Sequence, residues 1–231
     1  MKTDKLAVAI VSGGMDSVTL AYLLHDQGYA LHLLSFDYGQ RHKKELAFAA
    51  QCAAALGARH DVVDLSNITG FLSGSALTDD IDVPEGHYAA DNMKLTVVPN
   101  RNAMMLTVAY AVAVAEQADV VATGVHAGDH HIYPDCRPDF VRTFDAMQRV
   151  AVEGFGKPDL HLYAPFVEIG KHDIVTIGHG LDVPYAATWS CYKGGDVHCG
   201  NCGTCVERRE AFKLAGVPDP TVYEDKELIP V

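Results

Sequence analysis

Four cysteines stand close together near the C-terminal end of the chain. Cys191 is followed by Cys199, Cys202 and Cys205, so the gaps between them are seven, two and two residues. Two CxxC units that share Cys202 are typical of thiolate ligands around a structural, tetrahedral zinc ion. A redox-active CxxC pair and a set of buried unpaired thiols are the alternatives, but neither requires four neighbouring cysteines. We predict one structural Zn²⁺ per chain with these four ligands and no open position, and we leave His198 outside because Cys199 competes for its place.

A second segment with chemical potential is the turn Val11-Ser12-Gly13-Gly14-Met15-Asp16-Ser17, which follows an apolar run. Two consecutive glycines let the backbone turn sharply and approach a ligand closely. Unpaired N–H groups and the positive dipole end at the start of the next helix bind anions such as phosphate. The alternative is an ordinary strand-to-helix turn whose Asp and Ser only cap the helix. The turn is not a Walker A loop, because no Gly-Lys-Ser/Thr follows it.

Strands and helices that would position these residues alternate along the chain. Short apolar runs predict the strands, and longer stretches with helical spacing predict the helices. This alternation predicts βαβ units, and therefore a parallel sheet covered by helices on both faces. The predicted strands are 5–11, 31–36, 59–63, 119–123 and 161–166, and the predicted helices are 16–25, 43–56, 102–116, 171–179 and 206–214.

Two longer stretches lack such a pattern. Residues 64–99 are irregular and acidic, as in functional or mobile loops, and 124–139 is predicted to be a polar loop. Its histidines, His126, His130 and His131, have no assigned role. We divide the chain into a nucleotide-binding α/β domain at 1–185 and a small zinc-binding region at 186–231 that packs on it.

Composition narrows the classes of partner. The formal net charge is −12, and no run of Lys or Arg is longer than a pair. Nucleic-acid binding usually requires a clustered basic face, so a nucleic-acid substrate is disfavoured. The longest apolar run is too short to span a bilayer, and no signal peptide is evident. We therefore expect a cytoplasmic protein with small-molecule ligands.

The full string SGGMDS after a hydrophobic strand resembles the PP-loop of ATP pyrophosphatases. This resemblance implies an adenine-nucleotide α-hydrolase-like (Rossmann-like) three-layer sandwich, with a small C-terminal zinc region added. It also implies that ATP is cleaved between its α- and β-phosphates and that AMP is transferred to a substrate oxygen. The loop from Val11 to Ser17 would then hold the pyrophosphate. Asp16 would help to hold Mg²⁺, because a bare carboxylate would repel pyrophosphate.

Other strings resemble the 7-cyano-7-deazaguanine (preQ0) synthase family. They are FDYGQRH at 36–42, VPNRN at 98–102, YPDCR at 133–137 and the C-terminal cysteines. The family forms the nitrile preQ0, a queuosine precursor, from 7-carboxy-7-deazaguanine, ammonia and two ATP. The resemblance implies a ligase that forms carbon–nitrogen bonds through an adenylated acid and an adenylated amide, and it suggests a homodimer.

Four more residues are candidates for the substrate pocket. Arg41 and Arg101 could each clamp phosphate or the substrate carboxylate, and we assign Arg101 a catalytic role beside Asp16. Asp135 and Asp139 could accept hydrogen bonds from a guanine-like ring, although a loop turn and a helix cap are almost equally good interpretations. We interpret Cys136 as a packed pocket residue rather than a nucleophile.

Two other functions remain open. A PP-loop tRNA sulfurtransferase would need a metal-free catalytic cysteine pair and a basic face for tRNA. A non-catalytic ATP-binding sensor with a zinc knuckle would bind ATP without releasing pyrophosphate.

Overall fold

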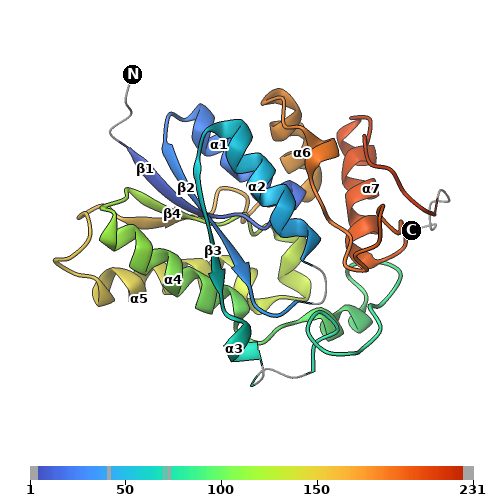
Figure 1. Ribbon diagram of the computed structural model, residues 1–231, viewed down its shortest axis with the longest axis horizontal. Coiled ribbons are helices and arrows are strands. Elements are labelled where there is room, and N and C mark those ends of the chain that lie inside the picture. The colour runs from blue at the N-terminus through green and yellow to red at the C-terminus, as the bar shows by residue number, and fades with distance from the viewer. Residues whose placement is uncertain (1–4, 41–42, 70, 72–73, 226–231) are drawn as a thin grey trace.

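The computed structural model describes residues 5–40, 43–69, 71 and 74–225 of the 231-residue chain. Its centre is a five-stranded parallel sheet in the order β3-β2-β1-β4-β5. The strands are β1 (Leu6–Ile10), β2 (Ala30–Asp37), β3 (Arg59–Asp64), β4 (Val120–Ala122) and β5 (His161–Tyr163). The predicted parallel sheet is therefore confirmed, and β1 is its central strand. Figure 1 shows β3 in front of the other labelled strands.

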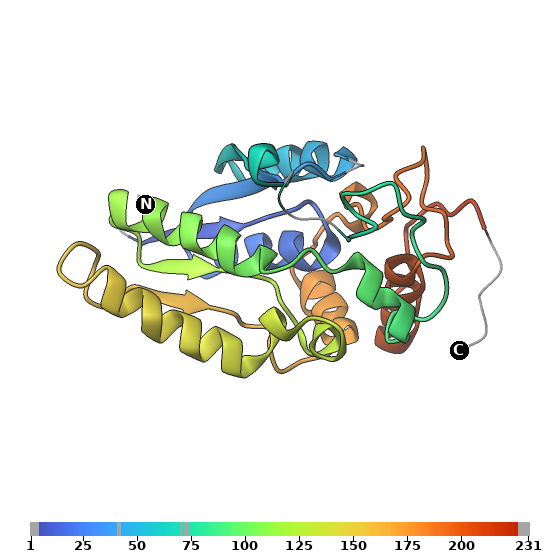
Figure 2. The same ribbon diagram turned by 90° about the horizontal axis from the view of Figure 1, so that it is seen from below.

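Helices cover both faces of the sheet. The α-helices are α1 (Met15–Asp26), α2 (Lys44–Leu56), α3 (Ser66–Thr69), α4 (Arg101–Ala115), α5 (Pro138–Ala151), α6 (Lys171–Gly180) and α7 (Gly203–Ala215). Short 3-10 helices are η1 (Asp91–Thr96), η2 (Ala127–His131), η3 (Pro134–Cys136) and η4 (Tyr185–Ala187). Figure 2 shows α4 and α5 side by side along one face.

Alternation along β1 divides the core into two layers. Ala7 and Ala9 pack with α1, α2 and α6, whereas Val8 packs with α4 and α5. Successive strand residues point to opposite faces, so each strand supplies both layers. This arrangement is the predicted three-layer sandwich.

Strand order places the candidate residues at one edge of the sheet. From β1 the chain continues through β2 to β3 on one side, and it later returns to β4 on the other side of β1. The carboxyl ends of β1 and β4 therefore flank a topological switch point, where ligands bind in open α/β sheets. The turn Val11–Ser17 leaves β1 at this point.

Several elements differ from the sequence prediction. Helix α5 is absent from the predicted set, and the predicted loop 124–139 contains η2, η3 and the start of α5. Strand β5 ends at Tyr163, three residues before the predicted end. Part of the irregular stretch 64–99 forms α3 and η1, and this stretch pairs with the cysteine region through a bridge between Glu85 and Cys202.

None of the helices in the described ranges combines the length and apolar character needed to cross a bilayer.

Candidate active site and metal centre

A cavity of about 260 Å³ opens at the carboxyl edge of the sheet. Segments that follow β1, β2 and β4 line it together with residues of α2, α4, α6 and α7, which explains why chemistry from distant parts of the sequence gathers there. Its polar and charged lining residues include Ser12, Asp16, Ser17, Tyr38, Glu45, Arg101, Asn102, Asp129, Tyr133, Lys171, Tyr192 and Glu207.

Hydrogen bonds of its own serine hydroxyl groups fix the conformation of the turn that carries the SGGMDS string. The Oγ atoms of Ser12 and Ser17 lie 3.2 Å apart, the backbone N–H of Gly14 donates to Ser12 Oγ, and Ser17 Oγ donates to the carbonyl of Gly14. Gly13 has a φ of 92°, and a Cβ there would lie 2.2 Å from the carbonyl oxygen of Glu45. Only glycine fits this position.

Asp16 faces a buried cluster of charged side chains on the floor of the cavity. Its Oδ2 lies 3.3 Å from Lys171 Nζ and 3.8 Å from His126 Nε2, and Lys171 also donates to Glu207. Burial acts to lower the pKa of Lys171, but Asp16 and Glu207 raise it above its usual range. Asp16 Oδ1 is buried and has no hydrogen-bond partner among the described residues, so it can accept a cation or a donor from a ligand.

Arg101 begins α4 and faces the same cavity from the opposite side. Its Nη1 donates to the Tyr38 hydroxyl at 3.2 Å, and its guanidinium carbon lies 5.3 Å from the centroid of the Tyr38 ring. No other hydrogen bond of this guanidinium occurs within the described residues. A permanently charged guanidinium whose other N–H groups face a cavity can bind a carboxylate or a phosphate.

The other candidate pocket residues have different surroundings. The carboxylate of Asp135 accepts from the backbone N–H of Asn102 and so caps the start of α4. Asp139 is 90% exposed at the start of α5, where it pairs with Arg142 outside the cavity. This placement favours the interpretation of Asp139 as a helix-end residue, and its contact with a guanine-like ring stays a prediction. Arg41 lies outside the described residues.

Four cysteine sulfurs meet at the start of α7. The Sγ atoms of Cys191, Cys199, Cys202 and Cys205 all lie within 4.8 Å of one another and are buried or nearly so. A hydrogen bond with Cys191 lowers the pKa of Cys199 to about 6, whereas contacts with the other three sulfurs raise the pKa of Cys205. Four thiolates this close together need a cation, so the site fits a thiophilic metal ion.

His198 does not join this cluster. Its Nε2 accepts a hydrogen bond from the backbone N–H of Ser190 at 3.1 Å, and its ring packs on Trp189 with 4.3 Å between ring centroids. Burial lowers the pKa of His198 to about 4, so the ring is neutral and suited to accept this bond.

The two remaining cysteines are poor nucleophiles. Cys52 lies on the buried side of α2 and packs in the core, where burial raises its pKa to about 12. Cys136 lines the cavity and accepts a hydrogen bond from Asn102 Nδ2, and burial together with Asp129 and Asp135 raises its pKa well above the usual range. Neither thiol has the low pKa expected of a catalytic cysteine.

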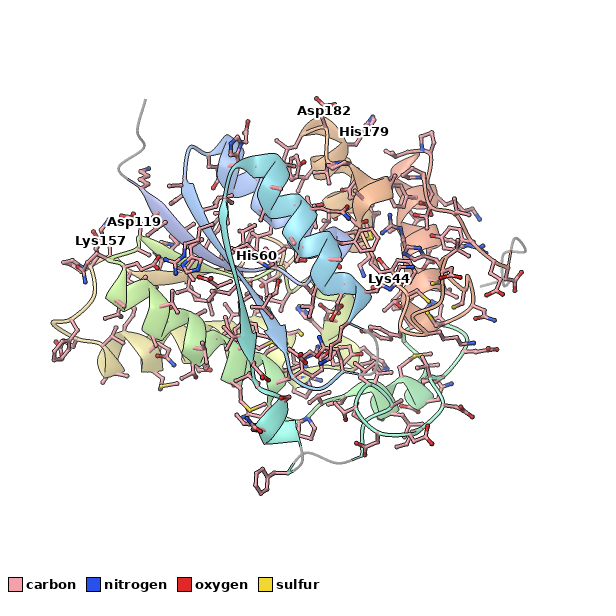
Figure 3. All side chains as sticks on the ribbon, viewed as in Figure 1. Lys44, His60, Asp119, Lys157, His179 and Asp182 are labelled. Atoms are coloured by element: carbon pink, nitrogen blue, oxygen red, sulfur yellow. The ribbon has the colours of Figure 1, made fainter. Side chains whose placement is uncertain are left out.

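The cysteine region is joined directly to the SGGMDS turn. The backbone N–H of Trp189 donates to the carbonyl of Gly13 at 2.9 Å. From α2, Lys44 lies 4.0 Å above the Trp189 ring and donates to the carbonyls of Gly195 and Asp196. Figure 3 shows Lys44 at the end of α2 that faces α7. A metal bound by the cysteines would therefore support the walls of the cavity.

Sequence reasoning missed several residues of this cavity. Glu45, Asp129, Lys171 and Glu207 come from four different elements or loops, and no local spacing links them. Their only local signals are positions close to helix starts, which capping explains equally well.

Comparison with known proteins identifies the family of this chain. A model of the family described as "Queuosine biosynthesis protein QueC" matches residues 6–216. A 7-cyano-7-deazaguanine synthase of Ruegeria pomeroyi is 60% identical over 95% of this chain and 95% of its own. One of Rhizobium meliloti is 61% identical over 94% of this chain and 92% of its own.

Among solved structures, an NMN synthetase of Francisella tularensis superposes with a TM-score of 0.50 at 17% identity, covering 93% of this chain and 78% of that protein. That likeness shows a shared fold. The family model and the close relatives both extend over nearly the whole chain, and we conclude that the chain belongs to the QueC family of queuosine biosynthesis proteins.

Proposed function

We propose that this protein is an ATP-dependent ligase that converts 7-carboxy-7-deazaguanine and ammonium into 7-cyano-7-deazaguanine. The observation that carries the proposal is the cavity itself. The glycine-rich turn, the unpartnered oxygen of Asp16 and the free donors of Arg101 surround one space, which supports binding of ATP and an acid side by side. The names of the close relatives give the same activity.

The chemistry requires a better leaving group than oxide. An acid becomes a nitrile only if carbon loses oxygen twice, first on the way to the amide and then from the amide. Transfer of AMP to each oxygen makes it a leaving group, so two ATP are consumed and two pyrophosphates are released. A turn that lacks the Walker lysine suits this reaction, because it can hold pyrophosphate as the leaving group rather than transfer the terminal phosphate.

Different groups of the cavity would bind different parts of the two substrates. Backbone N–H groups at the start of α1, with Ser12 and Ser17, would hold the pyrophosphate part of ATP. Arg101 would hold the substrate carboxylate against the α-phosphate, since a guanidinium binds carboxylate and phosphate oxygens in pairs. Holding both reactants in one geometry is the main catalytic contribution of such a site.

Two metals belong to the proposal. Asp16 would bind Mg²⁺ through its unpartnered oxygen, because Mg²⁺ prefers carboxylate and phosphate oxygens. When bound, Mg²⁺ neutralises charge on the phosphates of ATP. The four cysteines would bind one Zn²⁺ in a closed structural site that stabilises the cavity wall.

We further propose a cytoplasmic homodimer whose substrates are small molecules and not nucleic acids. Two apolar side chains near the end of α5, Val150 and Phe155, are each 76% exposed, and this exposure supports the proposal of association there. Light scattering checks this proposal, with a mass twice that of the 24.9-kDa chain expected. A monomer would contradict it.

The deciding experiment is product analysis. Protein, Mg²⁺, ATP, ammonium and 7-carboxy-7-deazaguanine are incubated, and mass spectrometry follows purines and nucleotides. We expect two AMP and two pyrophosphates for each nitrile, and one AMP without any ammonium requirement when the amide is supplied. ADP as the stoichiometric product, or an amide that is never converted, would contradict the proposal. A sulfur-containing tRNA product would favour the sulfurtransferase, and ATP binding without pyrophosphate release would favour the sensor.

A further inference from the structure

Glu45 is fixed against the phosphate-binding turn. It lies in the first turn of α2, and its carbonyl oxygen is the atom that a Cβ at Gly13 would meet. Its side chain lines the cavity together with Tyr38 and Arg101. The backbone of Glu45 therefore adjoins the turn proposed to bind the phosphates, and its side chain shares the cavity with the guanidinium proposed to bind the substrate carboxylate.

One oxygen of Glu45 is anchored and the other is available. Gln40 Nε2 donates to Glu45 Oε1 at 3.3 Å. Gln40 is buried and is itself fixed, because its Nε2 also donates to the carbonyl of Phe36 and its Oε1 accepts from the backbone N–H of Tyr38. Within the described ranges, Glu45 Oε2 has no hydrogen-bond partner, and it is not among the fully buried unpartnered atoms, so it can meet a ligand in the cavity.

The surroundings make Glu45 a stronger base than an ordinary glutamate. Burial raises its pKa to about 7, while Arg101 of α4 and the hydrogen bond from Gln40 act in the opposite direction. Tyr38, Tyr133 and Tyr192 complete the cavity wall around Arg101, and burial keeps all three phenols protonated. A general base works best when its pKa lies near the working pH.

The proposed reaction needs such a base twice. Ammonium has no free electron pair and must lose a proton before its nitrogen can attack the acyl adenylate. In the second half, the adenylated amide carries two N–H protons, and both must leave nitrogen before the C≡N bond is complete. In the described residues that line the cavity, no uncharged histidine or unpaired lysine stands beside Arg101 to accept them.

We propose that Glu45 is the proton acceptor for nitrogen in both halves of the reaction, an assignment that rests on the proposed function. In the first half, Glu45 takes one proton from ammonium, the nitrogen forms a bond to the acyl carbon, Glu45 takes a second proton from that nitrogen, and the bond from carbon to the AMP oxygen breaks. In the second half, Glu45 takes one N–H proton from the adenylated amide and then the other, and the electron pair of the second N–H bond completes the C≡N bond as AMP leaves with the oxygen. After each transfer Glu45 passes its proton to solvent through the open cavity, so it is ready to accept the next one.

A competing role for Glu45 is recognition of the deazaguanine ring through its N–H donors. The side chain of Glu45 shares the cavity with Arg101, which acts on its pKa, and this favours the base, because Arg101 is proposed to hold the reacting carboxylate and not the ring. The two roles predict different kinetics. A residue that recognises the ring (a ring reader) affects substrate binding and the first adenylation. A general base for nitrogen affects only the steps after adenylation.

The test separates adenylation from nitrogen transfer. Exchange of labelled pyrophosphate into ATP that requires 7-carboxy-7-deazaguanine, measured without ammonium, reports adenylation alone. Single-turnover amide formation with ammonium measures the later step. The variant Glu45→Gln keeps the size of the side chain and an oxygen for Gln40, so the fold should be retained. Glu153→Gln, an exposed glutamate beyond α5, is the matched control.

We expect Glu45→Gln to exchange pyrophosphate at the wild-type rate and to form amide about 10²- to 10⁴-fold more slowly. Wild-type amide formation should rise with pH through about 7 and then level off, because the carboxylate is the active form. Amide formation by the Glu45→Gln variant should show no rise near pH 7. Its rate should increase only at higher pH, because the fraction of free ammonia increases there. Glu45→Asp, which keeps the carboxylate but shortens its reach, should lie between the two.

Three results would overturn the assignment. Equal losses of exchange and amide formation with a raised KM for the acid would make Glu45 a ring reader. Unchanged amide formation in the variant would make it structural only. Absence of acid-dependent exchange in the wild-type protein would remove the proposed function, and the role of Glu45 with it.

Discussion

Lys171 is the buried cation that balances the acidic floor of the cavity. It contacts both Asp16 and Glu207, and its side chain is only 11% exposed. Its ammonium group pairs with both carboxylates and so offsets their negative charge inside the cavity. This cluster adjoins the turn Val11–Ser17, because Asp16 belongs to both.

Removing this cation should therefore destabilise the fold. We expect Lys171→Met to lower the free energy of unfolding by about 3–5 kcal/mol, because it leaves buried carboxylates without a partner. Denaturant unfolding measures the loss, and Lys171→Arg, which keeps the charge, should lose less. A Met variant as stable as the wild-type protein would contradict this prediction, because it would show that solvent already screens the charge of both carboxylates.

The two glycines of the turn should respond differently to the same substitution. Gly13→Ala places a methyl group against the carbonyl of Glu45 at a positive φ, so we expect at least about 1 kcal/mol of destabilisation. Gly14→Ala meets only ordinary contacts, at 3.4 Å from Ser12 Oγ and 3.6 Å from the carbonyl of Trp189. Its fold should be retained while its affinity for ATP falls. Denaturant unfolding and calorimetric ATP titration check the pair, and the reverse ranking in stability would contradict it.

At the scale of elements, α7 connects the metal centre to the active site. The helix begins at Gly203 within the cysteine cluster and carries Glu207 into the cavity one turn later. Arg208 on the same helix is fully buried and donates to Thr188 and to the carbonyl of Tyr185. The position of Glu207 therefore depends on how the cysteine cluster anchors the start of the helix.

Metal removal should accordingly weaken ATP binding as well as stability. Structural zinc contributes about 10 kcal/mol or more of apparent free energy in small domains, so chelation should lower the melting temperature. The only tryptophan, Trp189, lies between the cysteines and the turn, and its fluorescence reports both zinc loss and ATP binding. We expect a changed emission and a weaker ATP titration after chelation.

A cysteine outside the cluster supplies the control for this prediction. Cys52→Ala should retain one zinc per chain and the wild-type response to ATP, whereas Cys202→Ser should lose both. Substoichiometric zinc in wild-type protein purified without chelator, or an unchanged ATP titration after zinc removal, would count against the coupling.

At the scale of the whole molecule, charge separates the surface from the cavity. The chain has a formal net charge of −12, yet Lys171 and Arg101 place positive charge where phosphates and a carboxylate would bind. Such a distribution suits small anionic ligands that enter a cavity, and it opposes long polyanions that must lie along a surface.

We therefore expect no binding of tRNA at physiological salt. Gel-shift and filter-binding titrations with unmodified tRNA should show no retention, and added tRNA should not slow product formation from 7-carboxy-7-deazaguanine. A binding constant that falls steeply with rising salt would reveal a basic face and would reopen the sulfurtransferase interpretation.

Local sequence carried the information for features whose parts lie within a few residues of one another. The cysteine spacing brings four sulfurs together because Cys202 and Cys205 stand at the start of α7 and the other two precede it within a few residues. The SGGMDS string is a turn because its glycines permit it. Gly57 ends α2 in the left-handed conformation for the same local reason. The start of α5 also had a local signal, since Pro138 occupies its first turn and apolar residues recur with helical spacing, and the interpretation as a loop was wrong.

Tertiary structure decided which residues share the cavity. Glu45, Lys171 and Glu207 are separated by long stretches of chain and meet only because the parallel strands end at one edge of the sheet. Asp139 has the right chemistry for a ring reader but points to solvent, because the direction of a helix start is set by how α5 packs on the sheet. Residue type and spacing identify what a side chain can do, whereas the order of the strands determines what it can reach.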